Sequence, residues 1–229
     1  MKFSTIKHVF FDLDHTLWDF DRNSKQAFEI ILNPLFPQLD IEVFVSVYNP
    51  INQACWKLYQ VDKLTHEELR YKRLKDSFEV LQIPITDAQI YQLSDAYIAH
   101  LPTSNHLMDG CVEALEYLHQ KYSLHIITNG FAEVQFKKLH RSGIAHFFDT
   151  VTHSEMAGVK KPHPAIYEMA LKQAGAGKEE SIMIGDCLQA DVQGAMDFGI
   201  EALFFNPENM VVASEIKQIN NLVTLKNIL

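Results

Sequence analysis

The sequence predicts an α/β fold, a doubly wound parallel sheet with an all-helical domain inserted into it. Three short apolar segments, 9–11, 124–128 and 181–185, are of the kind found in strands that helices cover on both faces. Polar or acidic residues follow each segment directly, as expected at the carboxyl edge of an open sheet, where ligands bind. With 229 residues, the chain is long enough for one α/β domain and an insertion.

The first predicted strand, 9–11, runs into the acidic segment FDLDHT. Asp12 and Asp14 are expected to project from the strand end into the crevice, where two carboxylates repel each other. A divalent cation would remove that penalty, and one or two carboxylates with a substrate phosphate are the usual surroundings of Mg²⁺. A polar turn that only ends the strand is the alternative that this short segment leaves open by itself.

The interval between Thr16 and Met108 predicts a domain made of helices. Its helical patterns cover 24–32, 43–58, 65–81 and 86–101, with Pro34, Pro37 and Pro84 between them. We therefore expect residues 1–16 and 106–229 to form the α/β core domain and residues 17–105 to form a helical cap domain. The basic residues between positions 70 and 75 are expected on a solvated helix face.

The second predicted strand ends in Thr128, Asn129 and Gly130. A hydroxyl, an amide and a glycine before a new helix are groups that bind phosphate, and helix capping is the alternative for Thr128 or Asn129. Further along the chain, Lys161 lies in GVKKPHP. The two prolines of that segment fix the backbone and could aim an ammonium into the same site.

The third predicted strand has Asp186 at its tip, and Asp191 follows five residues later. Gly185 is expected to permit close backbone approach and unusual dihedral angles at the strand end. Asp191 is expected to open a helix. There it would either cap the helix terminus or support a metal site without contacting the ion.

The segments FDLDHT, ITNG, GVKKPHP and GDCLQAD, in this order, resemble the four signature motifs of the haloacid dehalogenase-like hydrolase superfamily. The resemblance implies a Rossmann-like core in which Asp12 is the nucleophile and Asp14 is the general acid and base. It also implies that Thr128 and Lys161 bind the substrate phosphate. Lys161 is assigned this role rather than Lys160 because the lysine of the superfamily directly precedes the proline.

The same resemblance, which spans about residues 6–205, implies one Mg²⁺ ion. Its ligands would be the Asp12 side chain, the Asp14 backbone carbonyl and Asp186, with Asp191 supporting them. An aspartyl-phosphate would form, and Asp14 would protonate the leaving alkoxide and later take a proton from water. In this superfamily an inserted helical cap closes over the site, excludes water and selects the leaving group.

Asp14 argues against the dehalogenase branch of the superfamily, whose members lack a second aspartate and release halide without a proton. A sugar-phosphate phosphatase or a phosphomutase would use the same core residues. His15 favours a phosphatase, because sugar-phosphate mutases usually carry Gly at this position. A module that only binds phosphometabolites is the non-enzymatic alternative, although such a module has no need of a protonatable acid beside a nucleophile.

The segments TNGF, FFD (147–149) and GVKKPHPAIYEMALKQAG resemble most closely the pyrimidine 5′-nucleotidase branch, cytosolic enzymes that dephosphorylate small nucleoside monophosphates. The sequence therefore predicts a Mg²⁺-dependent phosphomonoester hydrolase, with a 5′-nucleotidase as its most specific form. Four aromatic residues either stack on a base or pack inside the cap. They are Trp18, Phe20, Trp56 and Tyr59.

The composition limits the partners. A net charge of −9 and dispersed cationic residues argue against binding a nucleic-acid polymer or a membrane surface, both of which demand basic patches. Three cysteines without paired metal spacing fit a reducing cytosol, and neither a signal peptide nor a spanning segment is predicted. We expect a cytoplasmic protein that acts on small phosphoesters, and the sequence leaves its oligomeric state open.

Overall fold

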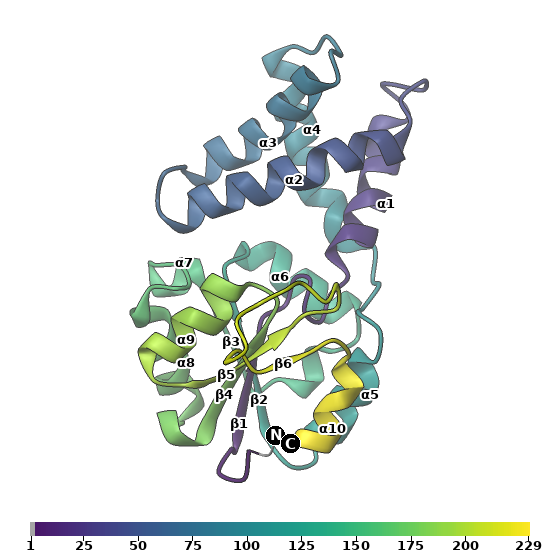
Figure 1. The fold of residues 1–229 in the computed structure, drawn as a ribbon. Helices are drawn as coiled ribbons and strands as arrows, with labels where there is room; N and C mark the ends of the chain where they lie inside the picture. The colour runs from purple at the N-terminus through teal and green to yellow at the C-terminus, as the bar shows by residue number, and fades with distance from the viewer. Residues whose placement is uncertain (1–2) are drawn as a thin grey trace. The chain divides into compact units, whose positions relative to one another are not determined.

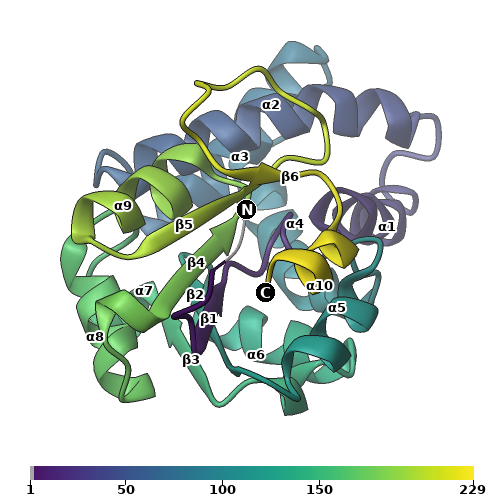
Figure 2. The same cartoon turned by 60° about the horizontal axis from the view of Figure 1, so that its bottom comes forward.

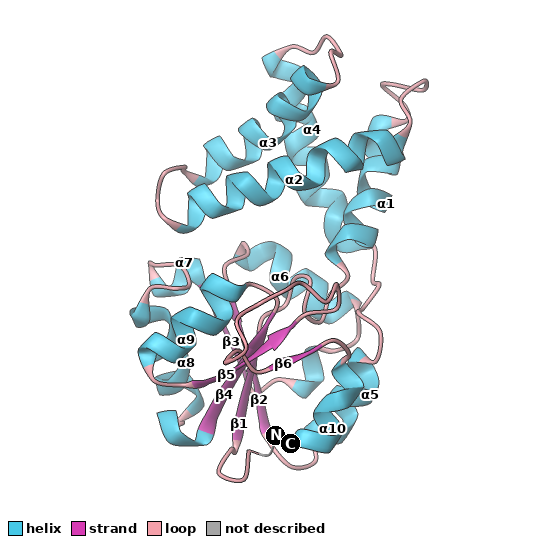
Figure 3. Ribbon diagram, in the orientation of Figure 1, coloured by secondary structure: helices cyan, strands magenta, loops and turns pink. Residues whose placement is uncertain are grey.

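The structure is a computed structural model that describes residues 3–229, and it divides into two compact units. The core unit includes the chain up to Asp19 and from His106 onward, and the helical unit is Phe20–Asn105. The strands gather in the core unit, whereas the helical unit consists of helices and loops (Figure 1 and Figure 3). That the helical unit acts as a cap stays a prediction.

The core unit contains a six-stranded parallel sheet with the strand order β3-β2-β1-β4-β5-β6. This is the strand order of the doubly wound Rossmann fold, so the predicted fold class is confirmed. The strands are β1 (His8–Phe11), β2 (Ser123–Thr128), β3 (Thr150–His153), β4 (Ser181–Gly185), β5 (Glu201–Phe205) and β6 (Gln218–Ile219).

Helices cover both faces of the sheet, because right-handed crossovers that run in opposite directions along a sheet lie on opposite faces. Figure 1 and Figure 2 show α8 and α9 on one face and α5 and α10 on the other. The helices are α5 (Cys111–Leu118), α6 (Ala132–Arg141), α7 (Ser154–Ala157), α8 (Pro164–Ala174), α9 (Gly194–Phe198) and α10 (Leu225–Ile228). Phe10, Met183 and Phe204 of the sheet are fully buried against α8 and α9.

The direction of the connections reverses between β1 and β4, which are neighbours in the sheet. Phe11 lies opposite Ile184, and the backbone N–H of Asp12 continues the ladder by donating to the Ile184 carbonyl at 2.9 Å. In doubly wound folds the ligand crevice opens at such a reversal, outside the carboxyl ends of the strands. Asp12 after β1 and Asp186 after β4 therefore leave the sheet at the same edge.

The helical unit contains the four predicted helices, α1 (Phe20–Leu32), α2 (Ile41–Gln60), α3 (His66–Val80) and α4 (Asp87–His100). Capping boxes fix the starts of two of them, at Thr65 before α3 and at Thr86 before α4. Phe28 centres the aromatic core of the unit, with the Tyr97 ring at 4.5 Å. Among residues 3–229, no helix is both long enough and apolar enough to cross a membrane.

The prediction of a solvated basic face between positions 70 and 75 is wrong for Arg73. This side chain lies inside the helical unit and is 2% exposed. Its Nη1 donates to Asn52 Oδ1 at 3.2 Å, and its guanidinium carbon lies 5.0 Å from the centre of the Tyr97 ring. A basic stretch in a sequence indicates charge, and only the packing of α3 against α2 and α4 decides which of its members is buried.

Candidate active site

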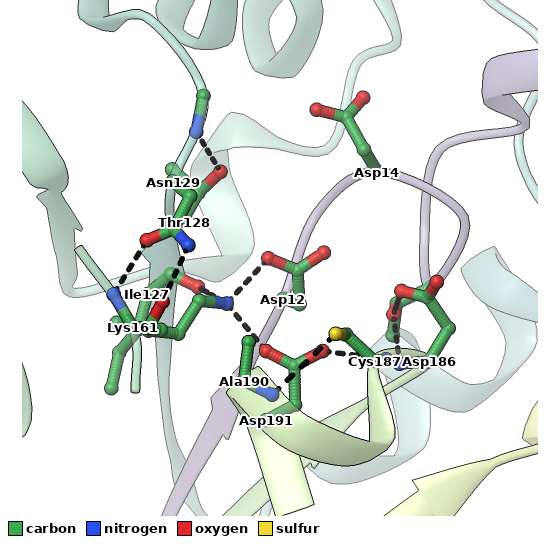
Figure 4. A network of polar contacts seen from close by, with 12 residues as sticks. Asp12, Asp14, Ile127, Thr128, Asn129, Lys161, Asp186, Cys187, Ala190 and Asp191 are labelled. Atoms are coloured by element: carbon green, nitrogen blue, oxygen red, sulfur yellow. Dashed lines mark hydrogen bonds and ion pairs between the residues drawn. The ribbon is translucent and has the colours of Figure 1, made fainter. Parts of the chain in front are cut away.

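Asp12 and Lys161 form a buried ion pair at the end of β1. Lys161 Nζ lies 2.6 Å from Asp12 Oδ1, and the lysine side chain is only 2% exposed (Figure 4). Burial raises the pKa of Asp12 well above its usual value. Lys161 opposes this effect, while Asp191 and Asp186 add to it through their negative charge. The site therefore holds more carboxylate charge than the lysine alone offsets.

All three protons of the Lys161 ammonium have acceptors within hydrogen-bonding distance. Besides Asp12, they are Asp191 Oδ1 and the Ile127 backbone carbonyl, each at 2.6 Å. Burial tends to lower the pKa of Lys161, but the two carboxylates outweigh it and raise the pKa above its usual value. Lys161 is thus a permanent cation here, and a phosphate oxygen would have to share or replace one of these acceptors.

Asn129 positions Lys161 through its backbone. The Asn129 Oδ1 accepts from the Lys161 N–H at 2.7 Å, and its Nδ2 donates to the Lys161 carbonyl at 2.9 Å. The bond between Lys161 and Pro162 is a cis peptide. The Asn129 side chain is therefore engaged in holding the lysine, and its role in binding phosphate stays a prediction.

Asp191 is fully enclosed behind the Asp12–Lys161 pair. Its Oδ2 accepts from the Cys187 backbone N–H at 2.9 Å, while Oδ1 faces the lysine. It lies in the first turn of a short π-helical segment, Leu188–Gln193, whose N-cap is Cys187 rather than Asp191. A side-chain carbon at Gly185 would lie 2.3 Å from Asp191 Oδ2. Glycine is therefore required at position 185, because the Asp191 side chain approaches its backbone closely. The backbone of Gly185 does not adopt a positive φ, in contrast to our prediction of unusual dihedral angles.

Asp186 at the tip of β4 is clamped by Thr16. The Thr16 hydroxyl donates to Asp186 Oδ1 at 2.9 Å and accepts from the Asp186 backbone N–H at 3.1 Å. Burial, together with the charge of Asp191, raises the pKa of Asp186 to about 7. Thr16 thereby connects the turn that follows β1 to the end of β4. It also holds the Asp186 carboxylate near that of Asp191.

These carboxylates form a donor set that suits a hard cation. Oxygen atoms of Asp12, Asp186 and Asp191 all lie within 4.8 Å of one another, and the Lys161 ammonium contacts two of these three groups, Asp12 and Asp191. Burial is the main cause that raises the pKa values of Asp12 and Asp186, and repulsion from the neighbouring carboxylates adds to it. A divalent cation with a preference for oxygen ligands would relieve that repulsion, so the residues fit Mg²⁺.

Asp14 lies apart from this cluster, and its carboxylate turns away from Asp12 (Figure 4). Two side chains of α6 that sequence reasoning missed contact it. Lys138 Nζ lies 2.5 Å from Asp14 Oδ1, and Gln135 Nε2 donates to Asp14 Oδ2 at 2.9 Å. Because Lys138 belongs to the cationic stretch FKKLHR, it was indistinguishable from an exposed lysine. The only local signal was its position one turn after Gln135, on the same helix face.

His15 adopts a left-handed backbone conformation, with φ of 59°. Glycine is favoured in this region because it has no side chain to clash. His15 thus occupies a position where glycine would be free of strain, and the preference for a phosphatase over a mutase that we drew from His15 stays a prediction.

Thr128 ends β2 beside Asn129. Its Oγ1 accepts from the Gly130 N–H at 3.1 Å and from Gln135 Nε2 at 2.7 Å. With both lone pairs used, the hydroxyl has its proton to offer to a ligand. The structure thus brings Thr128, Lys161 and Asp12 to one edge of the sheet, as the sequence predicted.

The surroundings of Cys187 and Trp18 indicate structural roles for both residues. Burial raises the pKa of the Cys187 thiol to about 11, which keeps it protonated and poorly nucleophilic. Trp18 is fully buried in the core unit, with the Lys138 ammonium 4.2 Å from the centre of its ring. Neither predicted role fits Trp18: the ring packs in the core unit rather than in the cap, and a buried ring has no face to offer to a base.

The fold and the site together define an α/β protein whose acidic centre lies at the reversal point of a doubly wound sheet. The model of the haloacid dehalogenase-like hydrolase family matches residues 9–205, and this chain belongs to that family.

Named relatives and solved structures agree with this assignment. The chain is 34% identical over 215 residues to the pyrimidine 5′-nucleotidase PynA of Streptococcus pneumoniae, covering 89% of this chain and 85% of that protein. It is 29% identical to the glyceraldehyde 3-phosphate phosphatase of Methanothermobacter thermautotrophicus, covering 89% and 87%. The crystal structure of the putative hydrolase YfnB from Bacillus subtilis, described as bound to magnesium, superposes with a TM-score of 0.87 at 26% identity and 97% coverage of both chains.

Proposed function

We propose that this protein is a Mg²⁺-dependent phosphomonoester hydrolase whose substrates are small nucleoside 5′-monophosphates. The observation that carries the proposal is the Asp12 carboxylate, held 2.6 Å from the buried Lys161 ammonium at the end of β1. A carboxylate attacks a phosphate ester only where the negative charge of the phosphate is offset. Lys161 supplies a fixed positive charge at that place, and the Thr128 hydroxyl supplies a hydrogen-bond donor.

In the first half of the reaction, an Asp12 oxygen forms a bond to phosphorus and the ester bond to the leaving oxygen breaks. Asp14 donates its proton to that oxygen, so the product leaves as a neutral alcohol. In the second half, Asp14 takes a proton from a water molecule as the water oxygen attacks phosphorus. The bond between Asp12 and phosphorus then breaks, which restores both carboxyl groups.

In this proposal the Asp12 side chain, the Asp14 backbone carbonyl and Asp186 hold Mg²⁺, and Asp191 supports them through its contacts with Lys161 and Cys187. When bound, the ion offsets the charge of the phosphoryl oxygens. Thr16 keeps the Asp186 carboxylate in place, and Asn129 keeps the Lys161 backbone in place. The helical unit, Phe20–Asn105, which lies within the predicted cap domain of residues 17–105, acts as a cap that selects the leaving group.

The substrate class is supported by the pyrimidine 5′-nucleotidase of Streptococcus pneumoniae, with 34% identity over most of both chains. A sugar-phosphate phosphatase is the second candidate. It is supported by the similarity to proteins named glyceraldehyde 3-phosphate phosphatase and ribulose-1,5-bisphosphate 5-phosphatase. A phosphomutase shares the core residues and is tested in the same way. We place the protein in the cytoplasm, in keeping with three free cysteines.

A phosphate-release assay on a panel of phosphoesters tests the proposal. The purified protein is assayed with pyrimidine and purine nucleoside monophosphates, sugar phosphates and p-nitrophenyl phosphate, each with Mg²⁺ and with EDTA. We expect turnover that requires Mg²⁺ and ranks pyrimidine monophosphates first. A sugar phosphate in first place would replace the nucleotidase assignment, and isomerised product without phosphate release would indicate a mutase. Metal-independent turnover would overturn the Mg²⁺ dependence, and absent turnover would favour the binding module.

A further inference from the structure

Helix α6 presents two buried polar side chains to Asp14. Gln135 and Lys138 are three positions apart and therefore lie on the same helix face. Gln135 is 1% exposed and Lys138 is 2% exposed, although both belong to residue types that are normally solvated. Burying an ammonium costs several kcal/mol in general unless it is paired and hydrogen-bonded, so these contacts must be specific.

Each oxygen of the Asp14 carboxylate has its own donor. Lys138 Nζ lies 2.5 Å from Oδ1, and Gln135 Nε2 lies 2.9 Å from Oδ2. Because a carboxylate oxygen has two lone pairs, these two bonds leave acceptor capacity for the proton that Asp14 would transfer. The side chain is thus held at both oxygens without being blocked.

Gln135 also connects Asp14 to Thr128. Its Nε2 carries two protons, and the second is donated to Thr128 Oγ1 at 2.7 Å. A side-chain carbon at Gly130 would lie 2.3 Å from Gln135 Nε2, so the glycine makes room for this amide. A chain of hydrogen bonds therefore runs from Lys138 through Asp14 and Gln135 to Thr128.

Lys138 also contacts Trp18. Its ammonium lies 4.2 Å from the centre of the Trp18 ring, a distance suited to a cation–π interaction. Trp18 pairs with Asp14 in a β-bridge of the turn that follows β1. Lys138 thus contacts two residues of this turn, the Asp14 carboxylate and the Trp18 ring.

We propose that Lys138 and Gln135 are positioning residues that hold the Asp14 carboxyl group for proton transfer and couple it to the phosphate-binding hydroxyl of Thr128. This rests on the proposed function, in which Asp14 is the general acid and base. Lys138 and Gln135 keep their own protons throughout, and only Asp14 gives and takes one. Proton transfer from a displaced acid is slower, so the loss should grow with the basicity of the leaving group.

The experiment compares kcat/KM for phenyl phosphate and for p-nitrophenyl phosphate. These esters have similar shapes, but phenolate is the more basic leaving group and depends more on a proton donor. We expect Lys138→Met and Gln135→Met to lower kcat/KM for phenyl phosphate by about 10²-fold. For p-nitrophenyl phosphate we expect them to lower kcat/KM by only about tenfold. Lys138→Arg should restore most of the loss, because it keeps a donor and a charge.

Lys137→Met is the matched control. Lys137 is the neighbour of Lys138 on α6, but it is exposed and pairs with Glu133 at 2.5 Å. It should leave both substrates unaffected. In an Asp14→Asn background, Lys138→Met should cause little further loss, because the residue that it positions is already inactive.

The outcomes separate this inference from the proposed function. If the wild-type protein hydrolyses both esters and Lys138→Met lowers them equally, or not at all, the positioning role is overturned and the hydrolase stands. If Lys138→Met unfolds the protein, as shown by its melting temperature, the comparison is made with Gln135→Met, because this substitution removes no charge. If the wild-type protein hydrolyses neither ester, the proposed function fails, and the role of Lys138 and Gln135 fails with it.

Discussion

Lys161 in the core unit and Arg73 in the helical unit are both buried cations, each 2% exposed, and their surroundings are opposite. Lys161 contacts two carboxylates and a carbonyl at 2.6 Å. Arg73 has no carboxylate within ion-pair distance in residues 3–229, and its Nε and Nη2 donors have no hydrogen-bond partner there. Asn52 and the Tyr97 ring are its polar and aromatic neighbours.

The contrast shows that neither unit balances its buried charge. The acid cluster around Lys161 contains more negative charge than one ammonium offsets, whereas Arg73 is a positive charge without a counter-ion. Both arrangements cost stability, since an unpaired buried charge is among the least favourable features of a protein interior. Removal of the cation should therefore have opposite consequences in the two units, and the following predictions test this.

The largest effect is expected at Asp12, the carboxylate that faces Lys161. Asp12→Asn keeps the size of the side chain but removes the attacking oxygen, so phosphatase turnover should fall by about 10⁴-fold or more. The loss of turnover is measured as phosphate release in the presence of Mg²⁺. Asp197→Asn is the matched control, because this acid lies exposed on α9, where it accepts a hydrogen bond from Gln193 at 2.7 Å. Full activity in Asp12→Asn would remove the proposed mechanism.

The second effect is on stability at Lys161. Lys161→Met leaves Asp12 and Asp191 buried without their cation, so the free energy of unfolding in EDTA should fall by about 3–5 kcal/mol. Urea denaturation followed by fluorescence measures the change. The exposed Lys172→Met on α8 should change it by no more than about 0.5 kcal/mol. A loss below about 1 kcal/mol for Lys161→Met would show that the ion pair contributes little.

The sequence was sufficient for the residues whose type and position both carry information. Asp12 and Asp186 follow strand ends, Lys161 directly precedes a proline, and the ordered combination of their motifs resembles that of one superfamily. The strand segments were recognisable because parallel strands buried on both faces are continuously apolar. β5 and β6 were not predicted, and Gln218–Ile219 of β6 is too short to show a pattern.

Gln135, Lys138 and Arg73 were missed for a different reason. Their burial depends on how a helix docks against other elements, and the local sequence of α6 or α3 is the same whether a given face is covered or solvated. Both lysines of FKKLHR have the same local character, yet one contacts Asp14 and the other faces solvent. The helix periodicity indicated which residues share a face, but only tertiary packing determines what that face contacts.

The third prediction concerns Arg73 and has the opposite sign. Arg73→Met removes a buried charge while keeping much of the side-chain volume, so the free energy of unfolding should be unchanged or rise by up to about 2 kcal/mol. Urea denaturation under the conditions used for Lys161→Met gives the comparison. Arg70→Met on the same helix is the control. Arg70 pairs with the exposed Asp95, and its loss should cost at most about 1 kcal/mol. A large loss for Arg73→Met would show that its contacts with Asn52 and Tyr97 outweigh the cost of burial.

The last effect depends on pH and is expected at His125, a buried group in β2. Burial, and then the neighbouring His8, lower the pKa of His125 to about 4, against a partial opposing effect of Asp149. Since the unfolded chain binds this proton near pH 6.5 and the folded chain only near pH 4, the contribution of neutral His125 to stability is fully present above pH 6.5 and is lost as the pH falls toward 4.

The difference in unfolding free energy between wild type and His125→Gln, measured in urea from pH 8 to pH 4, should therefore shift against the wild type as the pH falls. A difference that stays constant over this range would show that His125 titrates in the folded protein as it does in the unfolded chain. The core unit would then tolerate a buried, unpaired cation in the way that the helical unit tolerates Arg73.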